Sequence, residues 1–448
     1  MRNVIARLFN LERHEATAVI AGFGMFLLLF AGFFMLRPVR ETMGVAGGVD
    51  NLPWMFTATF VGVLVTMPAF GWLAARVARR RILYWVFGYV AATLLLFAAC
   101  MTLLPQDPWL ARAFYIWYSV FNMLAISVAW SVLVDVFAIG QAKRLFALMA
   151  AGASLGGLCG PLLADRLVEP LGHAGLLALS SLFLAGSAFA ASRVQRWRDL
   201  HPLPAGEQLS DLKPLGGNPF AGALDVLRSP YLMGIAVFVL LLATLNTFLY
   251  LRQAELVAGM FPDATQQTQV FARIDFVVQA LSLLAQLFVT GRLAQRLGVR
   301  VLLAGIPLLM AAGFLWLALA PVFAVFVVVM VARRAGEYAF IRPGREMLYT
   351  VVPPEQKYKA KNFNDTVVYR GGDALSAWIK AGIDVVAQQP MVAMLIGTGI
   401  ALAWAANGVW LSRALDRRGT AQGPDAPASP DHAMQQGARG PETRQAGS

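Results

Sequence analysis

The sequence has few charged residues, few cysteines and few histidines. Charged residues make up 14% of the 448 positions, whereas an ordinary globular protein carries roughly 25%. The two cysteines, Cys100 and Cys159, lie inside apolar runs, so a disulfide framework is not supported. The four histidines stand apart from one another, and we expect no metal site and no other cofactor. These shortages argue against a soluble or secreted protein.

Motifs of ATP-driven pumps and of enzymes are also missing. No phosphate-binding loop of the pattern GxxxxGK[ST] occurs, which argues against a chain that hydrolyses ATP itself. No nucleophile, metal cluster or acid/base pair stands out, so we expect no enzyme. No signal-peptide cleavage site follows the first apolar run, because Arg37 and Pro38 come next. That run is expected to remain as the first helix.

Long apolar runs are what the sequence does contain. Hydrophobic residues make up 58% of it, and runs of about 20 residues, long enough to span a bilayer, recur along its length. We predict an all-α polytopic membrane protein of about twelve transmembrane helices in two six-helix halves. The predicted helices lie near 16–36, 53–74, 82–104, 109–137, 145–164, 174–192, 231–251, 268–290, 301–320, 322–352, 362–386 and 390–411.

Composition divides the chain into four segments. We expect an N-terminal half at 1–192, a cytoplasmic linker at 193–230, a C-terminal half at 231–411 and a disordered cytoplasmic tail at 412–448. The linker is rich in proline, glycine and charge, and the tail is polar, so neither can form a membrane span.

The formal net charge of +12 reflects topology rather than nucleic-acid binding. Basic residues sit in short connections between apolar runs, and their clusters fall in every second loop. By the positive-inside rule we expect a multi-pass protein of a bacterial inner membrane, surrounded by the lipid bilayer, with both termini in the cytoplasm. The oligomeric state stays open, and a monomer is compatible with the sequence.

Two segments repeat between the predicted halves. Residues 71–83 (GWLAARVARRRIL) match residues 291–303 (GRLAQRLGVRVLL), and each follows the second helix of its half. Both resemble the loop signature of the major facilitator superfamily (MFS), GxLADRxGRR, with Ala75 and Gln295 in place of its Asp. The resemblance implies an MFS-like fold, while the lost Asp weakens any claim for the usual Asp-Arg gating contact. A tight basic loop would explain one copy, but two copies at matching positions favour a repeat.

The tenth predicted helix carries charges where lipid is expected. A charge at the bilayer centre costs about 2.5–3.5 kcal/mol on insertion scales, so such residues mark pathways or paired networks. Arg334, Tyr338, Arg342, Arg345 and Tyr349 step by three or four residues, which places them on one stripe of the helix. We expect this stripe to face a cavity rather than lipid.

Part of this charge is expected to be neutralised within the helix. The predicted i,i+4 pairs are Arg333 with Glu337 and Arg342 with Glu346. Arg334 and Arg345 have no such local partner. Pro343 removes one helix hydrogen bond and is expected to kink the helix, which exposes a backbone carbonyl toward the cavity.

Other predicted helices add charges to the same region. They are Arg37 and Arg40 on the first helix, and Asp365 and Arg370 on the eleventh, which Gly371 and Gly372 are expected to break. A salt-bridge network between helices is the alternative for any single residue. For the whole set, the excess of arginine favours an anionic substrate, because guanidinium groups bind phosphate or carboxylate with two hydrogen bonds.

The fifth predicted helix carries a stripe of small residues. Gly152, Gly156 and Gly160 are spaced by four, a pattern that allows two helices to approach closely. We expect the stripe to serve helix packing.

Residues 340–349 (FIRPGREMLY), followed by Pro353 and by Lys357, Lys359 and Lys361, resemble the non-mitochondrial ATP:ADP antiporters of plastids and intracellular bacteria. Residues 36–41 (LRPVRE), and Trp130 upstream of Asp135, look like elements of the same family. The resemblance runs over most of residues 16–411. It implies nucleotide exchange through an MFS-like fold.

The resemblance also implies phosphate-contacting residues. One family lysine falls on Arg40 and another on Arg345, and both positions keep a positive charge. The family's glutamates in helix four and near helix seven have no acidic match, since Tyr118 or Ser119 and Asn246 or Thr247 stand there. These departures leave the substrate, the exchange stoichiometry and proton coupling open.

The sequence therefore predicts a secondary active transporter of an anionic, phosphate-bearing solute by alternating access, with ATP and ADP as first candidates. Arg40 and Arg345 are the predicted phosphate contacts. The predicted second-rank cavity residues are Arg37, Arg334, Arg342, Asp365 and Arg370. The alternatives are an MFS-like carrier of another charged metabolite, such as a siderophore or peptide-like product, and a non-transporting membrane sensor or scaffold.

Overall fold

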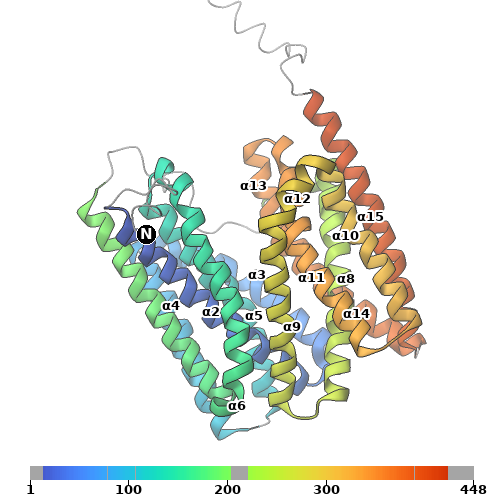
Figure 1. Cartoon of the computed structure of the whole chain (residues 1–448), viewed down its shortest axis with the longest axis horizontal. Helices are drawn as coiled ribbons and strands as arrows, with labels where there is room; N and C mark the ends of the chain where they lie inside the picture. The colour runs from blue at the N-terminus through green and yellow to red at the C-terminus, as the bar shows by residue number, and fades with distance from the viewer. Residues whose placement is uncertain (1–13, 78, 106, 203–219, 388, 422–448) are drawn as a thin grey trace, which may run out of the picture.

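The computed structural model describes residues 14–77, 79–105, 107–202, 220–387 and 389–421, which form two sets of helices side by side (Figure 1). The first half contains α2 (Ala16–Ala46), η1 (Val49–Asn51), α3 (Leu52–Arg76), α4 (Arg79–Leu103), α5 (Pro108–Val136) and α6 (Ile139–Leu200). The second half contains α7 (Ala223–Arg228), α8 (Pro230–Met260), α9 (Ala264–Ala285), η3 (Gln286–Thr290), α10 (Gly291–Leu319), α11 (Phe323–Gly336), η4 (Glu337–Ile341), α12 (Arg342–Leu348), η5 (Tyr349–Val351), α13 (Pro354–Phe363), η6 (Asn364–Val368), α14 (Tyr369–Ala387) and α15 (Pro390–Ala421).

Within the described ranges, nine helices are long and apolar enough to span a membrane. One of them, α6, is a hairpin, because its backbone bends at Gly172 (φ 64°) and Arg198 near its end donates to Gln141 near its start (3.0 Å). The positive φ suits glycine, which has no side chain to clash. The charged segments 323–348 and 354–387 supply two further spans, which completes the twelve predicted helices.

Twelve spans place both described chain ends on the same side of the membrane. We call this side, where α2 begins and α15 ends, the terminal side, and the other the far side; in Figure 1 the terminal side is at the top. The all-α polytopic fold predicted from the sequence is confirmed.

Several predicted boundaries are wrong, because the helices are longer than the apolar runs. The first, sixth, seventh and twelfth helices were expected to end at 36, 192, 251 and 411, but α2 continues to Ala46, α6 to Leu200, α8 to Met260 and α15 to Ala421. The ninth was expected to begin at 301, but α10 begins at Gly291. Each apolar run ends where its helix leaves the lipid, but the backbone hydrogen bonding of the helix continues beyond that point. In α6, for example, the buried side chain of Trp197 donates to the carbonyl of His14 (2.7 Å) and stabilises the extra turns. α7 lies inside the expected linker. The rest of that linker, 203–219, and the tail beyond 421 lie outside the described residues.

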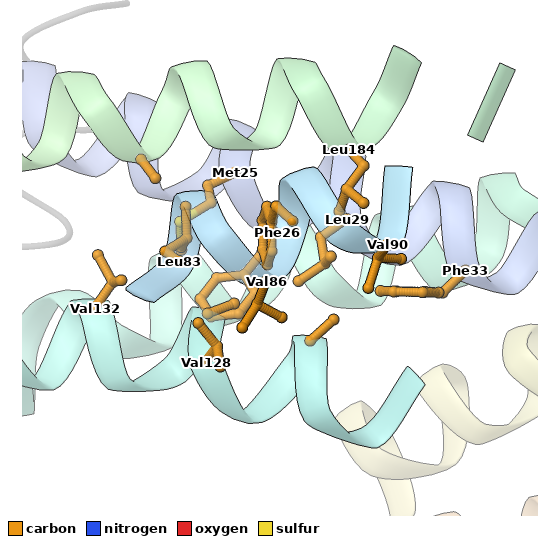
Figure 2. Close-up of a cluster of buried hydrophobic side chains, with 14 of the residues drawn as sticks. Met25, Phe26, Leu29, Phe33, Leu83, Val86, Val90, Val128, Val132 and Leu184 are labelled. Atoms are coloured by element: carbon orange, nitrogen blue, oxygen red, sulfur yellow. The ribbon is translucent and has the colours of Figure 1, made fainter. Parts of the chain in front are cut away.

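Each half has its own hydrophobic core. In the first half, α2 packs between α4, α5 and α6 (Figure 2). The side chains labelled there are Met25, Phe26, Leu29 and Phe33 of α2, Leu83, Val86 and Val90 of α4, Val128 and Val132 of α5, and Leu184 of α6. A second cluster joins α8, α10, α11 and α15 around the fully buried Trp404. Apart from Ala272 of α9, which packs into the first core, each core is built from residues of its own half.

The two halves meet on the far side. A buried cluster there contains Leu52 and Tyr115 of the first half and Leu251 and Ala377 of the second. Nearby, the hydroxyls of Thr42 (α2) and Thr268 (α9) lie 2.7 Å apart, and Nε2 of His173 lies 2.9 Å from the Thr268 hydroxyl. The far side is therefore closed by direct contact between the halves.

The glycine stripe packs as predicted. A Cβ added at Gly156 would lie 2.4 Å from the carbonyl oxygen of Leu27, and one at Gly152 would lie 2.3 Å from that of Phe23. These neighbours are backbone atoms of α2. Glycine is required because α2 and α6 approach each other too closely for any side chain.

Candidate substrate site

Pro343 shapes the helix that carries most of the intramembrane charge. Proline has no N–H, so the carbonyl of Ala339 loses its partner four residues on. The helix widens here into the π-helix η4, and Thr290 of the neighbouring π-helix η3 donates its hydroxyl to that carbonyl (2.9 Å). Gln286 likewise donates to the carbonyl of Tyr338 (3.1 Å). The predicted free carbonyl is therefore satisfied by α9–η3 rather than left open to a cavity.

The π-helix also changes which charges pair. Arg333 pairs with Glu337 (3.0 Å), as predicted, but Arg342 pairs with Glu337 across five residues (3.5 Å) instead of with Glu346. In a π-helix the backbone bonds residues five apart, and here the N–H of Arg342 bonds the carbonyl of Glu337, so the wider turn of η4 brings the Arg342 side chain toward Glu337. Glu346 pairs instead with Lys361 of α13 (2.7 Å). The single straight stripe expected from a regular helix is therefore wrong.

We predict that Thr290→Val lowers the free energy of unfolding by about 1–3 kcal/mol, because the carbonyl of Ala339 would be left buried without a donor. The thermal unfolding midpoint of the purified protein in detergent measures this. Thr93→Val is the matched control, since the Thr93 hydroxyl bonds only carbonyls of its own helix, α4. Equal midpoints for the two variants would contradict the role given to Thr290.

The centre of the molecule holds an ionic link between the halves. The carboxylate of Asp275 on α9 lies 2.5 Å from the guanidinium of Arg334 on α11 and 3.6 Å from that of Arg37 on α2. Arg37 also donates to the hydroxyl of Tyr338 (3.4 Å). Arg334, which the sequence left without a local partner, thus has one from another helix. The structure brings Arg37 and Arg334 together at one carboxylate.

Positive charge exceeds negative charge at this centre. The guanidinium of Arg342 lies over the ring of Tyr338 (4.4 Å) and its side chain is 55% exposed. The cluster as a whole contains Arg37, Arg333, Arg334 and Arg342 against Asp275 and Glu337, four positive groups against two negative ones. This excess of positive charge attracts an anion, and it would be energetically costly in contact with lipid.

Arg334 has one edge of its guanidinium unpaired. Its Nη1 binds Asp275, while Nε and Nη2 are buried and have no hydrogen-bond partner. These two nitrogens form the side fork that binds two oxygens of a phosphate or carboxylate in parallel. A buried unsatisfied donor costs about 1–3 kcal/mol, so the empty site would be stabilised by an oxyanion.

The structure places Arg40 and Arg345 away from this link, each with partners of its own. Toward the far side, Arg40 donates to Ser119 (3.0 Å) and to Glu41 (2.9 Å), and it stacks on the ring of Tyr115 (4.2 Å). Toward the terminal side, Arg345 pairs with Asp365 of η6 (2.9 Å), which explains why that carboxylate lies inside the span. Their role as phosphate contacts stays a prediction.

Arg370 of α14 belongs to a separate set of polar contacts. It pairs with Asp373 (3.5 Å), whose carboxylate also accepts from Thr247 (3.1 Å), and its Nη2 lies 3.2 Å from the sulfur of Met123 in the other half. Gly371 and Gly372 do not break the helix as expected. A Cβ at Gly372 would lie 2.9 Å from Leu240 of α8, so this glycine allows a close approach, and the irregularity lies before it, in η6.

A cavity of ≈ 590 Å³ opens between α8, α14, α15 and η1 near the far side. Lys380 is buried there and donates to Glu255 and Asp384 (2.6 Å each). The cavity lining contains three carboxylates, Asp50, Glu255 and Asp384, and two cations, Arg252 and Lys380. This cavity therefore lacks the positive excess of the centre and is the weaker candidate for an anion.

Sequence reasoning missed Asp275, the carboxylate at the middle of the site. It lies within the predicted helix 268–290, and an acidic residue inside an apolar run was the available signal. Its importance depends on two arginines that are 238 and 59 positions away in the chain. Only the packing of α2, α9 and α11 brings the three together.

Comparison with known proteins agrees with this architecture, although no family model matches the chain. The sequence is 22% identical to "ADP,ATP carrier protein 1" of Chlamydia muridarum (strain MoPn / Nigg), over 91% of this chain and 90% of that protein. A bacterial homologue of the iron transporter ferroportin in an inward-facing state superposes with a TM-score of 0.59 at 14% identity, covering 88% of this chain and 99% of that one. An inward-facing bacterial homologue of the lysosomal transporter Spinster gives a TM-score of 0.58 at 13% identity, covering 91% and 98%. The chain is therefore a multi-pass membrane protein with the fold of MFS transporters.

Proposed function

We propose that the protein is a secondary transporter that moves an anionic, phosphate-bearing solute by alternating access, with ATP and ADP as the first candidates. The observation that carries this proposal is the cluster of four arginines and two carboxylates between the halves, with the Nε and Nη2 edge of Arg334 unpaired. The similarity to proteins named ADP,ATP carriers supports nucleotides within that class.

The proposed contacts follow from the geometry. Arg37, Arg334 and Arg342 would bind the anionic groups, since Arg37 and Arg342 contact Tyr338 and Arg334 shares Asp275 with Arg37. Arg40 and Arg345 lie on either side of them and would bind the solute after releasing Glu41 and Asp365. Arg370 would line the same space from α14. Each charged hydrogen bond would contribute about 1.5–3 kcal/mol to binding.

The proposal also covers the orientation in the membrane and the movement of the two halves. We propose an inner membrane location with the terminal side in the cytoplasm, because basic residues gather in the loops on that side. The closed far side and the exposed guanidinium of Arg342 then suit a state open to the cytoplasm. The two halves, joined by the linker, would rock about the central cluster.

Uptake into proteoliposomes tests the function. We expect vesicles loaded with unlabelled ATP or ADP to accumulate labelled ADP, and empty liposomes to accumulate none. Inorganic phosphate, AMP, dicarboxylates and an anionic peptide complete the panel. Uptake of the peptide alone would support the carrier of another charged metabolite, and no uptake of any anion would favour a sensor or scaffold.

A further inference from the structure

Asp275 occupies the position where an anionic substrate group is needed. Its carboxylate lies between Arg37 of the first half and Arg334 of the second, and Asp275 is 3% exposed. One of its oxygens, Oδ2, accepts no hydrogen bond and is held near Arg37 only by charge, at 3.6 Å. An anion that enters the cluster therefore meets the same two guanidinium groups whose charge Asp275 offsets.

The halves must pass through a closed state to change sides. Water cannot screen charges in that state, and buried charges that lack a counter-charge are strongly unfavourable there. A loaded carrier has the anion as counter-charge for Arg37 and Arg334. In an empty carrier, the carboxylate that pairs with both of these arginines is Asp275.

Resting on the proposed function, we infer that Asp275 acts as an internal substitute for the substrate anion and lets the empty carrier change sides. The carrier is then able to perform net transport as well as exchange. Asp275 is a positioning residue in this role, since it acts through the two arginines and contacts no solute.

Removal of the carboxylate separates the two modes. In Asp275→Asn the empty carrier keeps both arginines without their counter-charge, so its return step slows. Exchange does not use that step, because the carrier crosses loaded in both directions. We expect net efflux of labelled ADP or inorganic phosphate into substrate-free buffer to fall at least about tenfold, and exchange against external unlabelled substrate to stay within about twofold.

Three further variants control for charge and for folding. Asp275→Glu keeps the carboxylate and is expected to keep net efflux. Asp165→Asn removes another carboxylate that links the halves, through Arg273 on the same helix as Asp275 (2.9 Å), and is expected to change neither mode. Asp275→Asn raises the positive charge of the empty site, and adding Arg37→Gln returns that charge to its original value. The ratio of net efflux to exchange should therefore recover in the double variant. Thermal unfolding midpoints are measured for all variants.

The outcomes are distinguishable. Loss of net efflux with exchange retained, and recovery in the double variant, would support the inference. If Asp275→Asn lowered net efflux and exchange in proportion, without recovery in the double variant, Asp275 would have only a structural role. If net efflux were unchanged, Asp275 would not act as the counter-charge of the empty carrier. Either result, obtained while the parent protein transports, overturns the inference. A parent that exchanges neither ADP nor inorganic phosphate would overturn the proposed function and this inference together.

Discussion

Arg334→Gln is expected to lower ADP exchange, measured as kcat/KM in proteoliposomes, by at least about 100-fold, because two charged hydrogen bonds to the solute are lost at about 1.5–3 kcal/mol each. The variant should still fold. Asp275 would retain Arg37 at 3.6 Å as a partner, so its charge would not be left isolated.

Two variants sharpen this test. Arg334→Lys keeps the charge beside Asp275 but lacks the planar fork, so an intermediate loss of about tenfold is expected. Arg166→Gln removes an arginine whose side chain is 78% exposed and which pairs with Asp165 outside the centre, and it should leave exchange unchanged. If Arg334→Gln exchanged as fast as Arg166→Gln, the free guanidinium edge would have no part in binding.

Gly156→Ala is expected to lower the thermal unfolding midpoint strongly, because the added methyl group would meet backbone atoms of α2. The new Cβ would lie 2.4 Å from the carbonyl oxygen of Leu27 and 2.8 Å from the backbone nitrogen of Ala31, and neither atom belongs to a flexible side chain. α2 and α6 would have to separate along their whole contact. Overpacking of this kind costs about 1–3 kcal/mol or more.

Gly24→Ala is the matched control on α2. A Cβ at Gly24 meets nothing within 4 Å, and alanine favours a helix over glycine by up to about 1 kcal/mol. The midpoint of this variant should be equal to or slightly above that of the parent. A fall in Gly24→Ala as large as that in Gly156→Ala would mean that glycine content, rather than the close approach, sets the stability.

Some features of the site could be predicted because their cause is local. Arg333 and Glu337 pair within one turn of helix, and four-residue spacing was enough to find them. The same rule failed for Arg342 and Glu346, because the π-helix η4 in the preceding turn, beside Pro343 and the hydroxyl of Thr290, brings Arg342 to Glu337 instead. Pro343 indicated an irregular turn, but the hydroxyl that bonds the freed carbonyl comes from Thr290 on another segment, so the change of partner could not be read from the local sequence.

Apolar run length by itself determined that the chain is a helical membrane protein of twelve spans, and the arginines inside those runs predicted an anion-binding centre. Those properties depend on composition along the chain, since a bilayer requires satisfied backbones and a minimum helix length. Tertiary structure alone decided that Arg37 and Arg334 share Asp275 while Arg345 pairs with Asp365. Ion pairs between helices depend on how distant segments pack, and many partners are equally compatible with the sequence.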